Sequence, residues 1–370
     1  YTFEDRGGRM VTLRPEMTPT LSRMIASRKR DLPLPIRWFS FPNLFRYEQP
    51  QKGRLREHYQ LNVDLFGIKS IEAEIEVISI GSAILHKLGA KSDDFRILIG
   101  NKKLYSAIID DLGLKTVSYE LSKLIDKKKK LSKDDFEKTL NTLAKDKAEI
   151  LLKLLSVEDL ESFIACLPED MRSHESLKEI EEVILGLNAQ GITNVEFRFD
   201  LMRGFDYYTG IIFEFFDTSS ENNRSLFGGG RYDELLSIFG EEPMPAVGFG
   251  MGDVTAKDFL ETHKISYKYK NPTDVSIITL GNIAPDFVYM IANSLRQSGI
   301  NTSIDWNDRK VGDKIKSADK QGIPYVICVG EEEMKSSSIA LKELSTGKEE
   351  IIKIEDVAKY IIKARSESDN

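Results

Sequence analysis

Residues 45–67, FRYEQPQKGRLREHYQLNVDLFG, form the stretch that decides the fold we predict for this chain. They are typical of two antiparallel strands joined by a loop, QPQKGRL (49–55). Alternation from residue to residue divides the second strand into two faces. One face is apolar or aromatic, and the other carries His58, Gln60, Asn62 and Asp64. The stretch therefore predicts an antiparallel sheet with one polar face.

This polar face has two interpretations. Antiparallel sheets commonly expose one face to water, and a wetted surface needs no ligand. The alternative is a binding site, because the residues on this face are hydrogen-bonding groups suited to recognition. The loop beside it contains Gly53 and the basic residues Lys52 and Arg54, and Arg56 directly follows it. A basic loop over a polar sheet face suits a polyphosphate ligand.

A second alternating stretch lies at residues 195–210, VEFRFDLMRGFDYYTG. Its apolar residues share one face, and continuing the same period places Arg203 on that face. A guanidinium cannot lose its proton, and burying one without a partner costs roughly several kcal/mol. We therefore expect an anion at Arg203. An internal ion pair is the alternative, and the acidic residues nearby are Asp200, Asp206 and Glu214.

Two shorter motifs carry weaker signals. In RPEMTPT (14–20), Thr18 before Pro19 is suited to cap a helix, whereas Glu16 just outside the cap has no such structural role. FGGGRYDELL (227–236) places three glycines at a predicted strand-to-helix junction. Tight packing alone would explain those glycines.

The composition is that of an ordinary globular protein, with 30% charged and 41% hydrophobic residues among 370. That length exceeds one ordinary core, so we expect two or three domains. The net charge of −7 gives no overall nucleic-acid signature, so such binding would rely on local basic patches. Two cysteines in apolar settings, Cys166 and Cys328, indicate a reducing compartment without disulfides or a zinc site. A membrane-spanning helix needs about 18 consecutive apolar residues, and no apolar run in the sequence approaches that length.

Changes in residue pattern predict four regions. Short strands mixed with helices fill residues 1–103, and strands resume at 191–262. Between them, residues 104–190 are rich in Lys, Leu, Asp and Glu at helical spacing, which predicts a helical insertion. Residues 272–366 alternate strands and helices, which predicts a separate α/β domain.

Two features of the predicted insertion are structural. DKKKK (126–130) is typical of a solvated helix face, and we assign it no site. Ser176 with Glu179 matches a capping box, so we expect Ser176 to begin the last helix of the insertion.

Together, the motifs resemble those of one family. RPEMT, FRYEQPQKGRLREHYQLNVDLFG, LMRGFDYYTG, GGGRYDELL and AVGFGMG are similar to segments of class II histidyl-tRNA synthetases. DRKVGDKIKSADKQGIPYVICVGEEE resembles the anticodon-binding domain that these enzymes share with a few other class II synthetases. The resemblance covers nearly the whole chain. The RGFDYY segment is specific to the histidine enzymes and their close paralogues, whereas the arginine hairpin is shared across class II. The implied fold is an α+β catalytic core on an antiparallel sheet with a helical insertion, followed by a C-terminal α/β anticodon-binding domain.

The resemblance implies a histidine–tRNA ligase. Such an enzyme converts histidine and ATP to histidyl-adenylate and pyrophosphate, and then transfers histidine to tRNA(His). Arg46 and Arg203 would hold the α-phosphate from two sides, where fixed guanidinium groups stabilise the charge that builds on the phosphoryl oxygens. ATP is the implied substrate, with Mg²⁺ on the pyrophosphate oxygens and no metal site made by the protein alone. A cytoplasmic homodimer without membrane contact is also implied.

Further roles follow position by position from the same resemblance. The histidine-binding positions are Glu16, Thr18, Gln60, Asp64, Arg203, Tyr207 and Tyr208. The ATP-binding positions are Arg46, Glu48, Arg54, Arg56 and His58, the last where an adenine-stacking ring is expected. The tRNA-binding candidates are Gln51 and Lys52 in the hairpin loop and Trp306, Arg309 and Lys310 in the last domain.

The tRNA candidates in the last domain have a structural alternative. Trp306 offers a stacking face, and Lys314 and Lys316 would add phosphate contacts to those of Arg309 and Lys310. Alternatively, Trp306 packs in the core at a strand end and the lysines are ordinary helix solvation.

The sequence departs from the family pattern in two places. Family members usually carry an arginine shortly after the GFGMG-type segment, where it contacts the ATP γ-phosphate and adenine. Asp253, Val254 and Thr255 occupy that place here. Either another residue supplies this charge, with Arg231 as one candidate, or nucleotide binding is weakened. The first class II motif, which builds the dimer interface, should precede Tyr1, so we interpret the chain as lacking its beginning.

Three alternatives to the ligase are considered. A non-catalytic paralogue that binds histidine and regulates histidine biosynthesis normally lacks the anticodon domain, so residues 272–366 argue against it. A synthetase-like binding module of a stress-sensing kinase usually loses catalytic residues, but Arg46, Gln60, Arg203 and both tyrosines remain. A sister synthetase for threonine, proline or glycine would share the last domain but not RGFDYYTG.

Overall fold

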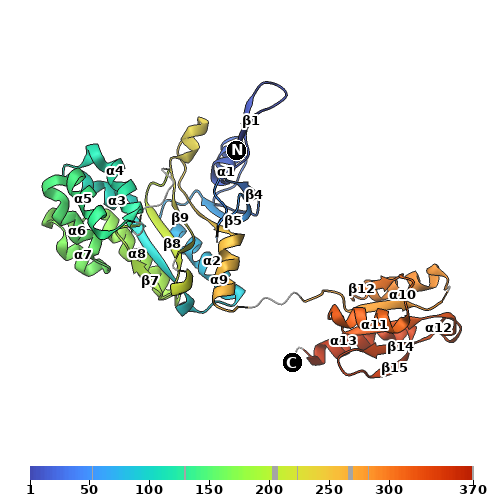
Figure 1. Cartoon of the computed structure of the whole chain (residues 1–370). Coiled ribbons are helices and arrows are strands. Elements are labelled where there is room, and N and C mark those ends of the chain that lie inside the picture. The colour runs from blue at the N-terminus through green and yellow to red at the C-terminus, as the bar shows by residue number, and fades with distance from the viewer. Residues whose placement is uncertain are drawn as a thin grey trace. The chain divides into compact units, whose positions relative to one another are not determined.

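The structure is a computed structural model of the chain, which describes residues 1–51, 53–128, 131–201, 207–222, 224–265, 270–281 and 283–368. The chain divides into two compact units, Tyr1–Ser266 and Tyr267–Asn370 (Figure 1). Each unit has its own hydrophobic core. Among the described residues, no helix combines the length and apolar character needed to cross a membrane.

A large sheet forms the centre of the first unit. Its strands run in the order β3-β5-β10-β9-β8-β6-β7, and β4 pairs with β5 off this path. The strands are β3 (Ile36–Ser40), β4 (Asn43–Phe45), β5 (Glu57–Phe66), β6 (Phe95–Asn101), β7 (Val195–Phe197), β8 (Ile211–Asp217), β9 (Ser225–Arg231) and β10 (Ala246–Gly252). All neighbours are antiparallel except β6 and β7, so the predicted antiparallel core is confirmed. A separate hairpin of β1 (Thr2–Glu4) and β2 (Met10–Thr12) precedes the sheet.

Strand β5 lies inside the sheet and separates two cores. It pairs with β3 and β4 on one side and with β10 on the other. Leu65 packs in the main core, and the next residue, Phe66, packs in a smaller core on the opposite face. The predicted alternation along this strand is therefore correct.

Helices cover both faces of the sheet. On the main-core side, α2 (Glu72–Leu88) packs on β5 and β10, and α9 (Asp253–Thr262) contacts the same two strands and β9. On the other side, α1 (Thr18–Ala26) contributes Leu21 and Ile25 to the smaller core. The polar residues of β5 share the face of this smaller core.

Two predictions about strand and helix ends are wrong in detail. Strand β7 ends at Phe197, although the burial alternation continues, and Phe199 and Leu201 are also buried. Helix α1 begins with Thr18 as its first helical residue, so the cap position belongs to Met17, whose side chain makes no capping bond. A proline tolerated in the first turn allows either register, and the sequence does not distinguish them.

The helical insertion lies between β6 and β7 in the chain. Figure 1 shows its first helices gathered on one side of the first unit. The helices are α3 (Lys102–Asp111), α4 (Ser118–Asp126), α5 (Lys133–Ala144), α6 (Ala148–Ser156), α7 (Leu160–Cys166) and α8 (Glu175–Ala189). Of the DKKKK run, Lys129 and Lys130 lie outside the described residues.

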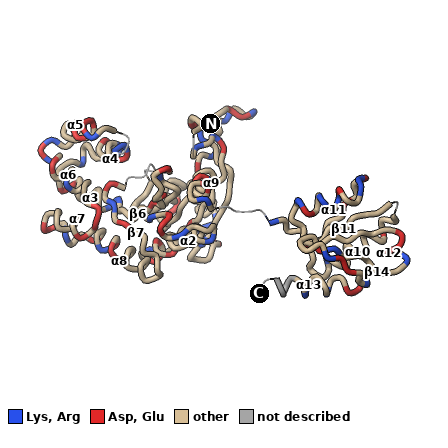
Figure 2. The backbone as a smooth tube through the Cα atoms, turned by 60° about the horizontal axis from the view of Figure 1, so that its bottom comes forward, with Lys and Arg blue, Asp and Glu red and all other residues tan. Residues whose placement is uncertain are grey.

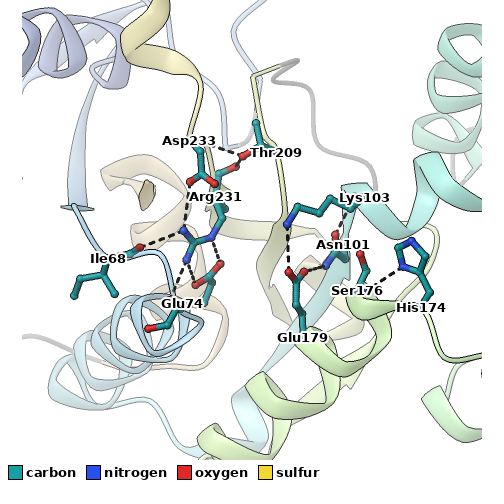
Figure 3. A network of polar contacts seen from close by, with 11 residues as sticks. Ile68, Glu74, Asn101, Lys103, His174, Ser176, Glu179, Thr209, Arg231 and Asp233 are labelled. Atoms are coloured by element: carbon teal, nitrogen blue, oxygen red, sulfur yellow. Dashed lines mark hydrogen bonds and ion pairs between the residues drawn. The ribbon is translucent and has the colours of Figure 1, made fainter. Parts of the chain in front are cut away.

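The predicted capping box at the start of α8 is wrong. The cap lies two residues earlier, at His174, whose side chain accepts a hydrogen bond from the backbone N–H of Ser176 at 3.2 Å. Glu179 instead accepts hydrogen bonds from Asn101 at 2.7 Å and Lys103 at 3.2 Å (Figure 3). A partner distant in sequence thus takes the carboxylate that the local motif assigned to the cap.

The second unit is a five-stranded sheet in the order β12-β11-β13-β14-β15. The first three strands in this order are parallel, and β13, β14 and β15 are antiparallel, so the predicted α/β domain is confirmed. The elements are β11 (Val275–Thr279), α10 (Pro285–Gln297), β12 (Thr302–Asp305), α11 (Val311–Lys320), β13 (Tyr325–Val329), α12 (Glu331–Ser336), β14 (Ser338–Glu343), β15 (Glu349–Lys353) and α13 (Val357–Ser368). Figure 2 shows acidic and basic residues mixed along both units, in keeping with the small net charge.

Candidate active site

A cavity of about 600 Å³ opens on the smaller-core face of the large sheet. Most of the residues predicted to bind histidine or ATP line it together. They are Glu16, Thr18, Arg46, Glu48, Arg54, His58, Gln60, Tyr207 and Tyr208. Gln51, predicted to contact tRNA, lies in the same lining. The structure therefore brings segments from both ends of the first unit's sequence to one site.

Glycines of β10 form the floor of this cavity. Across the β5–β10 pair, Gly248, Gly250 and Gly252 lie opposite Asp64, Asn62 and Gln60, respectively. A Cβ atom at Gly250 would lie 2.6 Å from Gln60 Nε2, and one at Gly248 would lie 2.5 Å from Asp64 Oδ1. Such contacts are too close for two non-bonded atoms. A row of polar side chains from β5 therefore lies beside three β10 positions that carry no side chain, and these glycines leave the space of the cavity open.

The glycines of GGGRYD occupy a different place from the predicted one. Gly228, Gly229 and Gly230 lie inside β9 rather than at a strand-to-helix junction. A Cβ atom at Gly230 would meet Tyr208 Cδ1 at 2.8 Å, and one at Gly229 would overlap the backbone oxygen of Gly248. These glycines let the tyrosine and the neighbouring strand approach closely.

An acidic group with an aromatic partner lies on one wall. Glu16 precedes α1, and its Oε2 accepts a hydrogen bond from the Tyr207 hydroxyl at 2.9 Å. Burial raises the pKa of Glu16, while the bond from Tyr207 and the charge of Arg46 oppose that shift. Tyr207 packs on the buried Tyr208, with ring centroids 5.1 Å apart. A carboxylate held in this way can receive an ammonium group.

Among the described carboxylates that face the cavity, Asp64 is the most deeply buried, with a relative exposure of 2%. Its Oδ1 accepts a hydrogen bond from the Tyr232 hydroxyl at 2.5 Å. Its Oδ2 and the Oδ1 of neighbouring Asn62 are buried and have no hydrogen-bond partner among the described residues. Buried acceptors without partners are costly, so both atoms are suited to N–H donors of a ligand.

Burial raises the pKa of Asp64 to about 7, against the bond from Tyr232. The unfolded chain binds the same proton with a pKa near about 4. The pKa of Asp64 is higher in the folded state than in the unfolded state, so its protonated form stabilises the folded state. This stabilisation is fully present below about pH 4 and is lost as the pH rises through about 7. We expect this group to lower the free energy of unfolding of the ligand-free protein by about 4 kcal/mol over that interval.

Denaturant unfolding of the native protein and of Asp64→Asn at several pH values measures this contribution. The difference between the two proteins should change with pH, because asparagine does not titrate and other groups are common to both. Identical pH dependence in the two proteins would contradict the raised pKa.

The basic side of the cavity comes from the hairpin loop. Arg46 Nε donates to the carbonyl oxygen of Pro15 at 2.8 Å, which fixes the guanidinium. Arg54 forms an ion pair with Glu48 at 3.2 Å. Burial, helped by the charge of Arg46, lowers the pKa of His58, so its ring is neutral near pH 7. A neutral ring beside fixed arginines suits a purine nucleotide.

Besides Asp64, which lies beside the cavity, three predicted site residues of the first unit are not among the described residues that line it. Arg56 donates from Nε to the carbonyl oxygen of Glu48 at 3.1 Å and lies 5.0 Å from the centre of the Tyr47 ring, outside the lining. Two others lie outside the described residues, namely Lys52 of the hairpin loop and Arg203, for which the sequence predicts an anionic partner.

Comparison with known proteins identifies the family. Residues 1–253 match the family described as histidyl-tRNA synthetase, and residues 274–364 match the one described as anticodon binding domain. The chain belongs to the histidyl-tRNA synthetase family. The histidine–tRNA ligase of Leptospira biflexa serovar Patoc is 38% identical over 356 residues, which cover 94% of this chain and 80% of that protein.

Solved structures show the same fold for histidyl-tRNA synthetases. The crystal structure of histidyl-tRNA synthetase from Nostoc sp. PCC 7120 superposes with a TM-score of 0.81 at 23% identity, covering 98% of this chain and 86% of that one. The crystal structure of an ATP phosphoribosyltransferase regulatory subunit/histidyl-tRNA synthetase from Bacillus halodurans C gives a TM-score of 0.71 at 25% identity. It covers 89% of this chain and 83% of that one.

The arginine expected at the position of Thr255 in this family is not replaced by Arg231. The Arg231 guanidinium is 5% exposed and forms a bidentate pair with Glu74, with both bonds at 2.5 Å (Figure 3). Its remaining donors contact Asp233 Oδ1 and the backbone oxygens of Ile68 and Ser70 at 3.2–3.3 Å. Burial alone would lower the pKa of Arg231, but Glu74 more than offsets this and raises it. The ion pair of Arg231 with Glu74 joins β9 to α2, so this guanidinium is not available to the nucleotide.

The candidate tRNA-binding residues of the second unit divide into two kinds. Trp306 is 45% exposed, with its ring 5.6 Å from that of Tyr289, so it does not pack in the core. Arg309 pairs with Asp305 at 3.1 Å, and Lys310 precedes α11. Lys314 was predicted as a phosphate contact, but it is buried, and its Nζ donates to the carbonyl oxygen of Thr279 at 3.1 Å. That prediction is wrong, because the ammonium already holds the ends of two strands together.

Several residues of this site went unassigned in the sequence, among them Asn62, Tyr232 and Glu214. Asn62 shares the polar face of β5 with Gln60 and Asp64, so its parity alone could have identified it. Tyr232 and Glu214 also line the cavity. No local pattern could have revealed them, because their place depends on the pairing of β8, β9 and β10.

Proposed function

We propose that this chain is a histidine–tRNA ligase, which forms histidyl-adenylate and pyrophosphate from histidine and ATP and then transfers histidine to tRNA(His). The observation that carries this proposal is the cavity, where buried acceptors on β5 lie over a glycine floor beside arginines of the hairpin loop. Buried acceptors suit the N–H donors of histidine, and arginines suit a polyphosphate. Membership of the family supports the same reaction.

In the first step, the histidine carboxylate attacks the α-phosphorus of ATP in line and pyrophosphate leaves. We assign the α-phosphate to Arg46, whose guanidinium is anchored on the Pro15 carbonyl, and to Arg203. Negative charge grows on the phosphoryl oxygens during the attack. A preorganised guanidinium therefore stabilises the transition state more than the bound substrates, without reorganisation of solvent.

Histidine is held by two groups of residues in this proposal. Glu16, with Thr18 and Gln60, receives the ammonium, and the Tyr207 hydroxyl positions the Glu16 carboxylate. Asp64 and Tyr208 receive the imidazole. The Tyr232 hydroxyl keeps Asp64 Oδ1 occupied, which leaves Oδ2 to meet an imidazole N–H. The orientation of the carboxylate toward ATP follows from fixing both ends of the amino acid.

Mg²⁺ fits the donors of this cavity as a partner of ATP. No cluster of three or more His, Cys, Asp or Glu suited to a metal occurs in the part of the chain that the structure describes. Mg²⁺ in such sites is bound by substrate phosphates with only one or two carboxylates. Glu48 and Glu214 are carboxylates in the lining and would hold the ion, which would neutralise charge on the phosphates.

A regulatory, non-catalytic role is the alternative function. The similar protein from Bacillus halodurans C is named both as an ATP phosphoribosyltransferase regulatory subunit and as a histidyl-tRNA synthetase. The arginines of the cavity and the second unit both favour the ligase. A protein that only senses histidine has no use for fixed arginines beside the amino-acid pocket or for a domain of the anticodon-binding family.

Histidine-dependent ATP–pyrophosphate exchange tests the proposal. We expect exchange with histidine and none with threonine, proline or glycine, because only histidine among them has a side-chain N–H donor for Asp64. Histidine binding without any exchange would instead support the regulatory alternative.

The second unit is expected to act only in the transfer step. Removing residues 272–370 should spare pyrophosphate exchange, since the cavity lies wholly in the first unit, which has its own core. Aminoacylation of tRNA should fall sharply, because proteins read single-stranded loops such as the anticodon by stacking and phosphate contacts. Raising the salt concentration should reproduce part of this loss.

Point variants refine that experiment. Trp306→Ala should weaken aminoacylation by about 10- to 100-fold if a base stacks on this ring. Ile351→Ala is the matched control, because Ile351 is another exposed apolar residue of the same unit, at 83% exposure. Undiminished charging of tRNA by the truncated protein would assign the second unit to another partner.

We also propose a cytoplasmic homodimer. Exposed aromatic residues that share one face on and beside β3, namely Phe39, Phe41 and Tyr59, are suited to contact a second copy. Phe41 and Tyr59 stack with ring centroids 5.6 Å apart. Cys166 and Cys328 are unpaired thiols, in keeping with a reducing compartment.

A further inference from the structure

We propose that Arg224 supplies, on the nucleotide side of the cavity, the positive charge that this chain lacks at Thr255. The inference rests on the proposed function and deepens it, because it assigns a further nucleotide-binding residue. Arg224 lies in the turn between β8 and β9, immediately before β9 begins at Ser225. No motif singled it out in the sequence.

Thr255 carries no charge, and its hydroxyl is bonded within the protein. It lies in the first turn of α9, and its hydroxyl is 2.8 Å from the carbonyl oxygen of Leu226 and 3.1 Å from that of Gly252. The Thr255 side chain therefore links α9 to β9 through its hydrogen bond to Leu226. That tie brings Thr255 next to Leu226, two residues along the chain from Arg224.

Arg224 lines the same cavity as Thr255 and reaches the hairpin loop. A Cβ atom at Gly53 would overlap Arg224 Nη1, so the guanidinium packs directly on the backbone of that loop. Gly53 has a positive φ of 77°, which favours glycine, and it also lies close to Asp258 of α9. The guanidinium therefore lies against the loop that carries Arg54, at a point where that loop also approaches Asp258 of α9.

Few of the described positively charged side chains face the cavity to bind a triphosphate. Three arginines line it among the described residues, namely Arg46, Arg54 and Arg224, and no described lysine does. Arg54 is already paired with Glu48. A triphosphate carries several negative charges, and a planar guanidinium can bind two of its oxygens at once. Arg224 is the arginine nearest in the chain to the segment that Thr255 contacts.

The matching of the two positions explains the departure from the family pattern. An arginine at residue 255 and one at residue 224 would approach the same nucleotide from adjacent segments, one from the helix and one from the strand. Only one is needed. A chain with arginine at residue 224 can use a small residue at 255 to anchor α9.

The test is a set of four variants in histidine-dependent pyrophosphate exchange, together with direct calorimetric binding of ATP. Arg224→Ala should raise the KM and the Kd for ATP by about 10- to 100-fold and leave the KM for histidine nearly unchanged. Arg224→Lys should retain part of the affinity. Arg224→Ala combined with Thr255→Arg should recover most of it. Lys257→Ala is the matched control, because it removes an exposed positive charge from α9 that pairs with Glu261 outside the lining.

Two results would overturn the assignment. One is an unchanged ATP affinity in Arg224→Ala, or an equal loss for ATP and histidine. The other is a double variant no better than Arg224→Ala alone. Both leave the proposed function intact if the native protein exchanges pyrophosphate. Absence of exchange by the native protein would instead remove the proposed function, and this inference with it.

Discussion

The native protein is expected to activate histidine about 10⁴–10⁵ times better, in kcat/KM, than an apolar isostere without imidazole N–H groups. The cause is Asp64, whose Oδ1 is held by Tyr232 while its buried Oδ2 has no partner among the described residues. An analogue without a donor would leave that oxygen desolvated and unpaired. Pyrophosphate exchange with each amino acid measures the ratio.

The matching variant is Asp64→Ala. It should lose histidine activation while keeping the fold, which circular dichroism and thermal unfolding would verify. Asp110→Ala is a suitable control, because Asp110 is an exposed carboxylate of the same unit that pairs with Lys115. Comparable activation of histidine and the isostere by the native protein would remove Asp64 from the imidazole site.

Arg46→Ala is expected to slow adenylate formation by about 10²–10³-fold, while the affinities for histidine and ATP change much less. The anchoring of Arg46 on the Pro15 carbonyl fixes the guanidinium before the substrates arrive, so its interaction grows as charge builds in the transition state. Single-turnover kinetics with separate titrations of both substrates distinguish a loss in rate from a loss in binding.

Two further variants complete this experiment. Arg203→Ala should show the same loss in rate, and the double variant should lose less than the product of the two, since both act on one phosphate. Arg23→Ala removes an exposed arginine at the end of α1 and should leave the rate unchanged. A loss in Arg46→Ala confined to substrate affinity would make Arg46 a binding residue only.

The sequence predicted the polar row of β5 well, because that row depends on strand parity alone. Alternation placed His58, Gln60, Asn62 and Asp64 on one face, and three of them line the cavity while Asp64 lies directly beside it. The antiparallel sheet and the α/β domain were predictable for the same reason, since each rests on a local pattern repeated over several elements.

Predictions that needed a partner distant in sequence failed. Arg231 appeared available for the nucleotide, but Glu74, 157 residues away, binds it. Lys314 appeared to be a surface lysine, but the end of β11 buries it. In both cases the side chain was of the right type for a phosphate. Only the packing of another element against it reveals that the charge is already used.

The glycine floor has a consequence for how this pocket can change over time. At Gly248 and Gly250, the smallest possible replacement is alanine, and its one added methyl group would already overlap the side chain of Asp64 or Gln60, respectively. Substitution at these positions can only narrow the pocket and never enlarge it. Drift toward a bulkier amino acid would therefore have to begin on the facing strand, where Gln60, Asn62 and Asp64 can be shortened. The glycine positions of β10 are the constraint, and the facing positions of β5 are where new specificity can arise.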